Sequence, residues 1–86
     1  MSKPSVHFIG IGGTGLSAIA RLLIESGYHV TGSDRLLSPL AASLQEAGAV
    51  IFVGHRAENV RQAGLVVRSS AVPDDNVEVQ AARSLH

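Results

Sequence analysis

Three glycines with a fixed spacing are the first residues of the chain that could do chemistry. Gly10, Gly12 and Gly15 form a G-x-G-x-x-G pattern directly after the apolar residues 6–11. This pattern is typical of a strand, a tight turn and a helix whose N-terminus binds an anion. The alternative is a turn whose glycines only let strand and helix pack closely. We predict a phosphate or diphosphate site at Gly12, Gly13, Thr14 and Gly15, with backbone N–H donors from the first three.

An acidic residue follows at the distance that a nucleotide site requires. Asp34 lies about 20 residues beyond the glycines, at the end of the second predicted strand, where dinucleotide-binding folds place an acid on a ribose. A carboxylate can accept hydrogen bonds from both vicinal hydroxyls of the sugar. The alternative is a solvated or capping aspartate. Together with the glycines, Asp34 predicts a nucleotide with a diphosphate and a free ribose, and leaves the base open.

Weaker candidates follow the later strands. His55 comes after the third predicted strand, and Ser69 and Ser70 come after the fourth. Each has a simpler interpretation, as a surface histidine or as turn-capping serines. Arg35 and Arg68 could pair with phosphates or remain solvated charges.

Several kinds of chemistry have no residues to support them. The chain has no cysteine, and Lys3 is its only lysine, so there is no P-loop for ATP. Serine, histidine and acid form no recognisable nucleophilic triad. His7, His29 and His86 show no metal-ligand pattern, and we predict no metal site. The chain is expected to bind a ligand rather than to catalyse.

Alternating strand and helix signals must position these residues. Helical spacing places Leu16, Ile19, Ala20 and Leu23 on one face, with Gly27 as a stop. Ser38 and Asn76 can cap later helices. The predicted strands are 6–11, 28–31 with an end at 32–34, 50–53 and 65–67, and the predicted helices are 14–26, 39–47, a short helix or turn at 57–62, and 77–85.

This order predicts an α/β fold. It is a Rossmann-like, doubly wound parallel sheet of four or five strands between helices, in which ligands bind beyond the carboxyl ends of the strands. The 86 residues form one domain, and the sheet would normally continue, so we expect a domain (residues 1–86) of a longer protein.

Composition limits the partners. The formal net charge is zero and only three residues are aromatic, which argues against nucleic acid as the main partner. No apolar stretch approaches a membrane span, and residues 1–4 lack a secretory signal. The expected location is the cytoplasm.

Four motifs resemble those of the Mur ligases. They are residues 7–17 (HFIGIGGTGLS), 30–34 (VTGSD), 54–55 (GH) and 69–72 (SSAV). The glycine pattern is shared with many dehydrogenases, whereas the pair G-S-D and S-S-A-V is more specific. The sequence departs from the family pattern at Thr14, where a smaller residue is more frequent, and at Arg68, where an apolar residue is usual.

The resemblance implies a cytoplasmic enzyme of peptidoglycan synthesis whose N-terminal domain holds the UDP portion of UDP-N-acetylmuramate. A central domain outside this chain would bind ATP and Mg²⁺, and a third domain would bring the amino acid. The sugar carboxylate would be phosphorylated and then attacked by an amine, so this fragment alone would not catalyse. The family positions correspond to Gly12, Gly13, Thr14 and Gly15 at the diphosphate, Asp34 at the ribose, Arg35, Leu36 and His55 near the uracil, and Ser69, Ser70 and Ala71 along the pocket.

Two alternatives stay open. A related ligase that attaches a recycled tripeptide to the same nucleotide sugar would use a similar domain. From a different class, a nicotinamide-dinucleotide domain of an oxidoreductase or regulatory subunit would share the glycines, with Asp34 selecting NAD.

Overall fold

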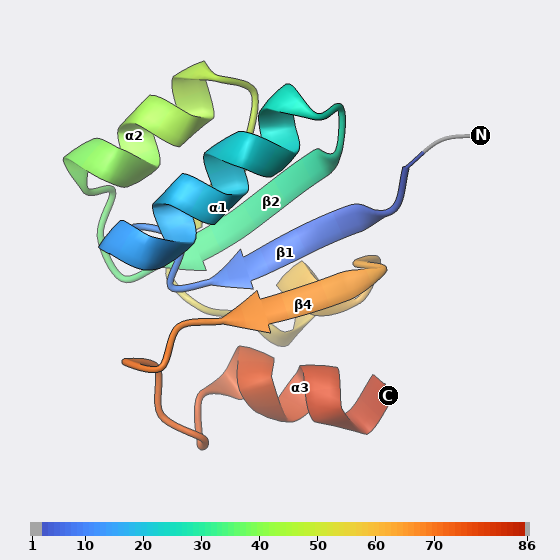
Figure 1. Cartoon of the computed structure of the whole chain (residues 1–86). Coiled ribbons are helices and arrows are strands. Elements are labelled where there is room, and N and C mark those ends of the chain that lie inside the picture. The colour runs from blue at the N-terminus through green and yellow to red at the C-terminus, as the bar shows by residue number, and fades with distance from the viewer. Residues whose placement is uncertain (1–2, 86) are drawn as a thin grey trace.

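The glycine pattern follows the central strand of a parallel sheet. In the computed structural model, which describes residues 3–85, the four strands are hydrogen-bonded in the order β3-β2-β1-β4 and all are parallel (Figure 1). The predicted α/β class is confirmed. The strands are β1 (Ser5–Ile9), β2 (His29–Asp34), β3 (Val50–Val53) and β4 (Leu65–Arg68).

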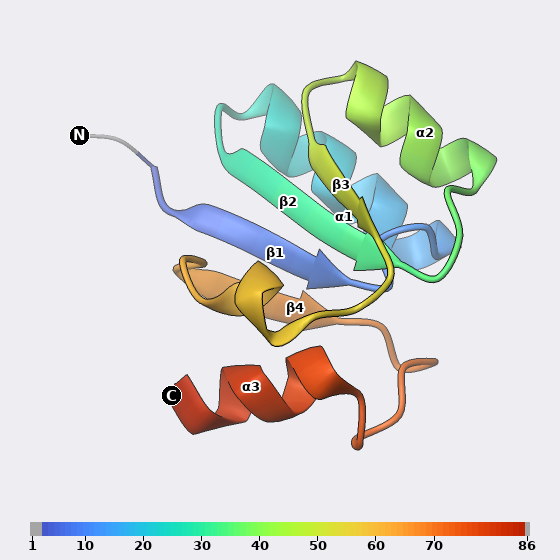
Figure 2. The same ribbon diagram turned by 180° about the vertical axis from the view of Figure 1, so that it is seen from behind.

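Helices cover both faces of this sheet. Helices α1 (Thr14–Glu25) and α2 (Pro39–Glu46) lie on one face, and α3 (Val77–Leu85) lies on the other with the short 3₁₀ helix η1 (Ala57–Val60) (Figure 1 and Figure 2). The chain adds β2 and β3 on one side of β1 and then returns to place β4 on the other. The strand order therefore reverses beside the glycine pattern, which is where doubly wound folds bind ligands.

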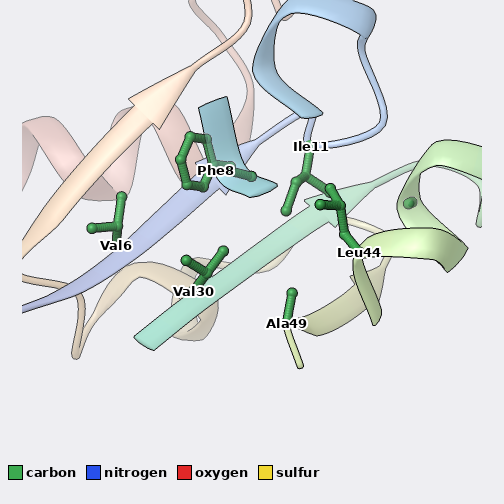
Figure 3. Close-up of a cluster of buried hydrophobic side chains, with 8 residues drawn as sticks. Val6, Phe8, Ile11, Val30, Leu44 and Ala49 are labelled. Atoms are coloured by element: carbon green, nitrogen blue, oxygen red, sulfur yellow. The ribbon is translucent and has the colours of Figure 1, made fainter. Parts of the chain in front are cut away.

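The larger apolar core lies under α1 and α2. Phe8, Ile11, Val30 and Leu44 are at most 2% exposed, and they pack together with alanines from the helices (Figure 3). A smaller cluster of Ile9, Val60, Val72 and Val79 lies on the other face. β1 contributes to both clusters, which confirms the prediction that it is covered on both faces.

The first strand ends earlier than predicted. Gly10 has a φ of +84°, a conformation that glycine adopts without the steric penalty of a Cβ, and it turns the chain out of the sheet. Ile11 therefore lies beyond the strand, where its side chain packs directly on Gly32 of β2. The predicted strand 6–11 was therefore wrong at its end. Ile11 is apolar because its side chain packs on β2, and not because its backbone belongs to the strand.

The first helix buries the predicted face at three of its four positions, and Ile19 is the exception. Ser17 and Ala20 are buried, Leu16 and Leu23 are half-buried, and Ile19 is 49% exposed. Helical spacing alone did not indicate that Ser17 would be buried and Ile19 exposed, because the small polar side chain of Ser17 can pack closely against the sheet.

The predicted helix ends are confirmed. Ser38 Oγ accepts a hydrogen bond from the Ala41 N–H at 3.2 Å. Asn76 Oδ1 accepts from the Glu78 N–H at 2.8 Å, which caps α3. Glycines follow the C-terminal caps of α1 and α2.

Within residues 3–85, no helix is both long enough and apolar enough to cross a membrane.

Candidate ligand-binding site

A cavity of about 630 Å³ opens at the carboxyl edge of the sheet. Its walls come from the turns after β1, β2, β3 and β4, so it lies where the strand order reverses. The lining residues are Gly10, Gly12, Gly13, Asp34, Arg35, Leu36, Ser38, His55, Ser69, Ala71, Val72, Pro73 and Asn76.

Most of the predicted site residues line this one cavity. Eight of the eleven are among its walls, although they come from four segments of the chain. Thr14, Gly15 and Ser70 are exposed and do not line it. Thr14 and Gly15 directly follow Gly13 at the start of α1, whereas Ser70 lies at the tip of the turn after β4.

Asp34 is held against the glycine turn. Its Oδ2 accepts a hydrogen bond from the Gly12 N–H at 2.9 Å, and its Oδ1 accepts from the Arg35 N–H at 2.8 Å. A Cβ on Gly12 would lie 2.8 Å from Asp34 Oδ2 and 2.5 Å from Ser38 Oγ. A larger residue at position 12 would therefore displace the Asp34 carboxylate and the Ser38 hydroxyl from this turn.

The free N–H donors differ from those expected. The Gly12 N–H donates to Asp34, and the Gly13 N–H donates to the Gly10 carbonyl at 3.1 Å. Intrahelical bonding begins with the Ser17 N–H. Within residues 3–85, the N–H groups of Thr14, Gly15 and Leu16 have no acceptor. The set of available donors is therefore shifted by two residues, and Thr14 is the one expected donor that remains free.

The side chain of Arg35 provides a positive charge at the same cavity. Arg35 lines it and makes no ion pair within the described part of the chain. Its guanidinium is available to an anion, and the N-terminus of α1 adds partial positive charge. The cavity thus has a carboxylate acceptor, Asp34, and a cation, Arg35, in its wall, and the free N–H groups of α1 begin at the residue after Gly13.

Sequence reasoning missed several wall residues. Ser38 and Asn76 had been assigned only as helix caps, and both also line the cavity. The signal was present, since a cap at the start of a helix after a parallel strand lies at the carboxyl edge of the sheet. Gly10 belongs to the glycine pattern and Val72 to the S-S-A-V motif, but neither had been assigned to the site, and Pro73 had no such signal.

The turn after β4 is fixed by its own hydrogen bonds. The Ser69 N–H donates to the Ile9 carbonyl at 2.9 Å, and Ser69 Oγ accepts from the Ala71 N–H at 3.2 Å. Ser69 thus shapes the turn and lines the cavity at once.

A buried carboxylate lies beneath the cavity. Glu78 of α3 is 0% exposed, and its Oε1 accepts hydrogen bonds from His7 Nε2 at 2.8 Å and Ser33 Oγ at 2.6 Å. Its Oε2 accepts from the Arg56 N–H at 3.0 Å and from Asn59 Nδ2 at 2.9 Å. One side chain therefore joins β1, β2, η1 and α3.

These donors keep Glu78 ionised. Burial is the largest single influence and raises the pKa, but the hydrogen bonds from His7, Ser33, Asn59 and the Arg56 N–H together lower the pKa from 4.5 to about 2. No sequence motif had singled out Glu78, and His7 had been considered only as a metal ligand. The two residues are 71 positions apart, and no local pattern joins them.

Arg68 is engaged away from the cavity. Its guanidinium donates to Asp74 Oδ1 at 2.5 Å and to the Val72 carbonyl. The hydrogen bond and charge of Arg68 are the main reason that the pKa of Asp74 is lowered. Arg68 lines a second cavity of about 530 Å³ between β4 and α3, which is mainly apolar. The suggestion that Arg68 pairs with a ligand phosphate is therefore not supported by its position.

The described residues do not fit a metal or ATP site. Within residues 3–85, no three histidine or acidic side chains are grouped to hold a metal ion. The only lysine is Lys3, which bonds the Ser26 carbonyl and lies over Tyr28.

Comparison with known proteins agrees with this geometry. The family model described as "Mur ligase family, catalytic domain" matches residues 5–86. The chain is 52% identical over 80 residues to a UDP-N-acetylmuramate–L-alanine ligase of Sulfurihydrogenibium sp. (strain YO3AOP1), covering 93% of the chain and 18% of the relative. It is 51% identical over 81 residues to the same-named ligase of Dichelobacter nodosus (strain VCS1703A), covering 94% and 17%.

Solved structures share the fold. The UDP-N-acetylmuramate–alanine ligase MurC of Thermotoga maritima has a TM-score of 0.90 and 40% identity, with 96% of the chain and 19% of that protein covered. A murein peptide ligase of Psychrobacter arcticus has a TM-score of 0.88 and 27% identity, with 96% and 18% covered. The chain thus spans less than a fifth of the length of these relatives. The resemblance noted in the sequence is confirmed, and the chain belongs to the Mur ligase family.

Proposed function

We propose that this chain holds the UDP portion of UDP-N-acetylmuramate in a cytoplasmic, ATP-dependent ligase that joins the sugar carboxylate to L-alanine. The observation that carries the proposal is the single cavity shared by the glycine turn, Asp34, His55 and Ser69 at the point where the strand order reverses. Relatives at about half identity bear the name of that ligase. The chain itself supplies binding, and the ATP, the Mg²⁺ and the amino acid belong to other domains of the protein.

The donors and acceptors suit the parts of this substrate. The N–H groups of Thr14 and Gly15 and the guanidinium of Arg35 favour the diphosphate. Asp34 offers carboxylate oxygens to the ribose hydroxyls, and its two backbone hydrogen bonds hold the carboxylate in place. The remaining residues assigned to the pocket are Leu36, His55, Ser69, Ser70 and Ala71. Ser70, like Thr14 and Gly15, does not line the cavity.

Titration of the chain with UDP-N-acetylmuramate and, separately, with NADH tests the proposal. We expect the UDP-sugar to bind and to raise the free energy of unfolding by about 2.7 kcal/mol when its concentration is 100 times the dissociation constant. Tighter binding of NADH, without a response to the UDP-sugar, would support a nicotinamide-dinucleotide domain instead. Binding of neither ligand would mean that the other domains supply most of the affinity, against the proposal.

Two substitutions locate the ligand. Asp34→Asn removes a charged acceptor and is expected to weaken UDP-sugar binding by about 10- to 100-fold. Asp75→Asn removes the same charge from an exposed position outside the cavity and serves as the control. Gly12→Ala should also weaken binding, because its Cβ would displace Asp34 and Ser38. Unchanged affinity in both variants would separate the glycine turn and Asp34 from the substrate.

A second candidate has one observation in its favour. A murein peptide ligase shares the fold with a TM-score of 0.88. Such a ligase would use this domain to bind the same nucleotide sugar. The two candidates therefore differ in the amine that is joined to the sugar, L-alanine or a tripeptide, and not in the nucleotide site. Assay of the whole protein with L-alanine and with a tripeptide distinguishes them.

A further inference from the structure

The ring of His55 is held from one side only. His55 Nδ1 lies 3.0 Å from Ser33 Oγ and 3.4 Å from Glu78 Oε2, and its side chain is 14% exposed. His55 Nε2 has no hydrogen-bond partner within residues 3–85. Because none of the buried side-chain nitrogens and oxygens described lacks a partner, Nε2 is accessible to solvent. His55 also lines the candidate cavity.

The location of one hydroxyl proton decides which ring nitrogen carries the proton in the neutral form of His55. Ser33 has one hydroxyl proton, and its Oγ lies 2.6 Å from Glu78 Oε1. An ionised carboxylate accepts hydrogen bonds only, so the Ser33 proton is committed to Glu78. Ser33 Oγ can then only accept from His55, and the second neighbour of Nδ1, Glu78 Oε2, is an acceptor as well. Both contacts require a proton on Nδ1.

From this arrangement we propose that Glu78, acting through Ser33, is a positioning residue that fixes neutral His55 with its proton on Nδ1 and presents Nε2 to the cavity as a hydrogen-bond acceptor. The hydrogen bond that His55 Nε2 accepts comes from an N–H or O–H group of the bound ligand. The ligand part of this inference rests on the proposed function, whereas the protonation of the ligand-free ring does not.

His7 provides an internal reference with the opposite pattern. His7 Nε2 lies 2.8 Å from Glu78 Oε1, so its proton belongs on Nε2. His7 Nδ1 lies 2.7 Å from Thr31 Oγ1, and that hydroxyl can donate to it. One carboxylate thus selects opposite tautomers in two histidines, because it faces different nitrogens of the two rings.

Nitrogen NMR of the chain labelled with ¹⁵N-histidine tests the inference. Long-range ¹H–¹⁵N spectra at alkaline pH, where imidazoles are neutral, distinguish a protonated from an unprotonated ring nitrogen. We expect the proton on Nδ1 in His55 and on Nε2 in His7, within one spectrum. A proton on Nε2 of His55 in the unmodified chain would overturn the proposal, and this measurement needs no variant.

Variants test the route through Ser33. In Glu78→Gln the Ser33 hydroxyl is released and can donate to Nδ1, so the His55 proton should move toward Nε2. Ser33→Ala removes the contact at 3.0 Å and leaves only the longer contact of Nδ1 with Glu78 Oε2 at 3.4 Å, so it should give a mixture of the two forms. The matched control is Glu58→Gln, which removes an exposed carboxylate from η1 and should leave the His55 signals unchanged. An unaltered His55 in Ser33→Ala would rule out the role of Ser33.

Addition of UDP tests the contact with ligand. Acceptance of a ligand proton should shift the His55 Nε2 signal, and Glu78→Gln should weaken UDP binding by about tenfold relative to Glu58→Gln. A saturating UDP complex with an unchanged Nε2 signal would overturn the ligand contact. If UDP fails to bind the unmodified chain, the proposed function fails, and the ligand-free tautomer still decides the role of Glu78 and Ser33.

Discussion

At the scale of single residues, two carboxylates have different roles, since one lines the cavity and the other is buried in a hydrogen-bond network. Asp34 is partly exposed at the cavity and is oriented by the Gly12 and Arg35 N–H groups. Glu78 is fully buried and accepts hydrogen bonds from side chains and backbone of three other elements. A buried charge is tolerable only when it is fully hydrogen-bonded, and Glu78 meets this condition.

Glu78 should make stability depend on acid pH. Because folding lowers its pKa from 4.5 to about 2, Glu78 stabilises the folded state above about pH 4.5, and this contribution is lost as the pH falls toward 2. The full contribution is on the order of 3 kcal/mol. Urea unfolding between these pH values should show the advantage of the unmodified chain over Glu78→Gln shrinking as the pH falls. A pH-independent difference, or the same trend in the exposed control Glu58→Gln, would contradict this assignment.

At the scale of elements, the turn between β1 and α1 is built by its close approach to β2. The Gly10 and Ile11 N–H groups both donate to the Ser33 carbonyl, at 2.8 and 3.0 Å. A Cβ on Gly32 would lie 2.3 Å from Ile11 Cδ1. The glycine of the G-S-D motif therefore serves packing, while the serine and aspartate that follow it serve the polar network and the cavity.

Gly32→Ala and Gly15→Ala form a matched pair for this interpretation. Gly32→Ala should destabilise the chain by about 1–3 kcal/mol, because Ile11 must leave its rotamer or the turn must shift. Gly15 has no atom within 4 Å of a built Cβ and lies in the first turn of α1, so Gly15→Ala should be neutral or stabilise by up to about 1 kcal/mol. Chemical denaturation measures both. Equal costs in the two variants would mean that Ile11 does not restrict position 32.

At the scale of the whole molecule, the two faces of the sheet are held by different forces. The face under α1 and α2 has the larger apolar cluster, whereas the face under η1 and α3 has four buried apolar residues and the hydrogen bonds of Glu78 (Figure 1 and Figure 2). Apolar burial is the dominant favourable contribution to folding. The face with η1 and α3 should therefore open at a lower free energy than the rest.

Hydrogen exchange tests this difference between faces. Amides of η1 and α3 should exchange faster than those of β1 and β2. Asn59→Ala removes a hydrogen bond to a charged group and should lower the opening free energy of η1 and α3 by about 1.5–3 kcal/mol, with less effect on β1. Glu58→Ala, which breaks only an exposed ion pair with Arg56, should change it by less than about 1 kcal/mol. Equal exchange rates on both faces would contradict the proposed difference in their opening free energies.

The sequence by itself determined the order of elements and most of the cavity wall. Glycine spacing, helix caps and alternating apolar runs are local signals, and they predicted the parallel α/β fold. Because parallel strands bring their carboxyl ends to one edge, Asp34, His55 and Ser69 could be assigned to a common site before their contacts were known. The same local signals misplaced the end of β1 and assigned Ile19 instead of Ser17 to the buried face of α1, where close packing overrides periodicity.

Only the tertiary structure decided which groups around the glycine turn are free and which are already bonded. The Gly12 and Gly13 N–H groups are satisfied by Asp34 and Gly10, so the open donors begin at Thr14. Likewise, Glu78 meets His7 and Ser33 across 71 and 45 residues of sequence. Hydrogen bonds depend on atoms within about 3 Å in space, and a single sequence carries no direct record of contacts between such distant positions.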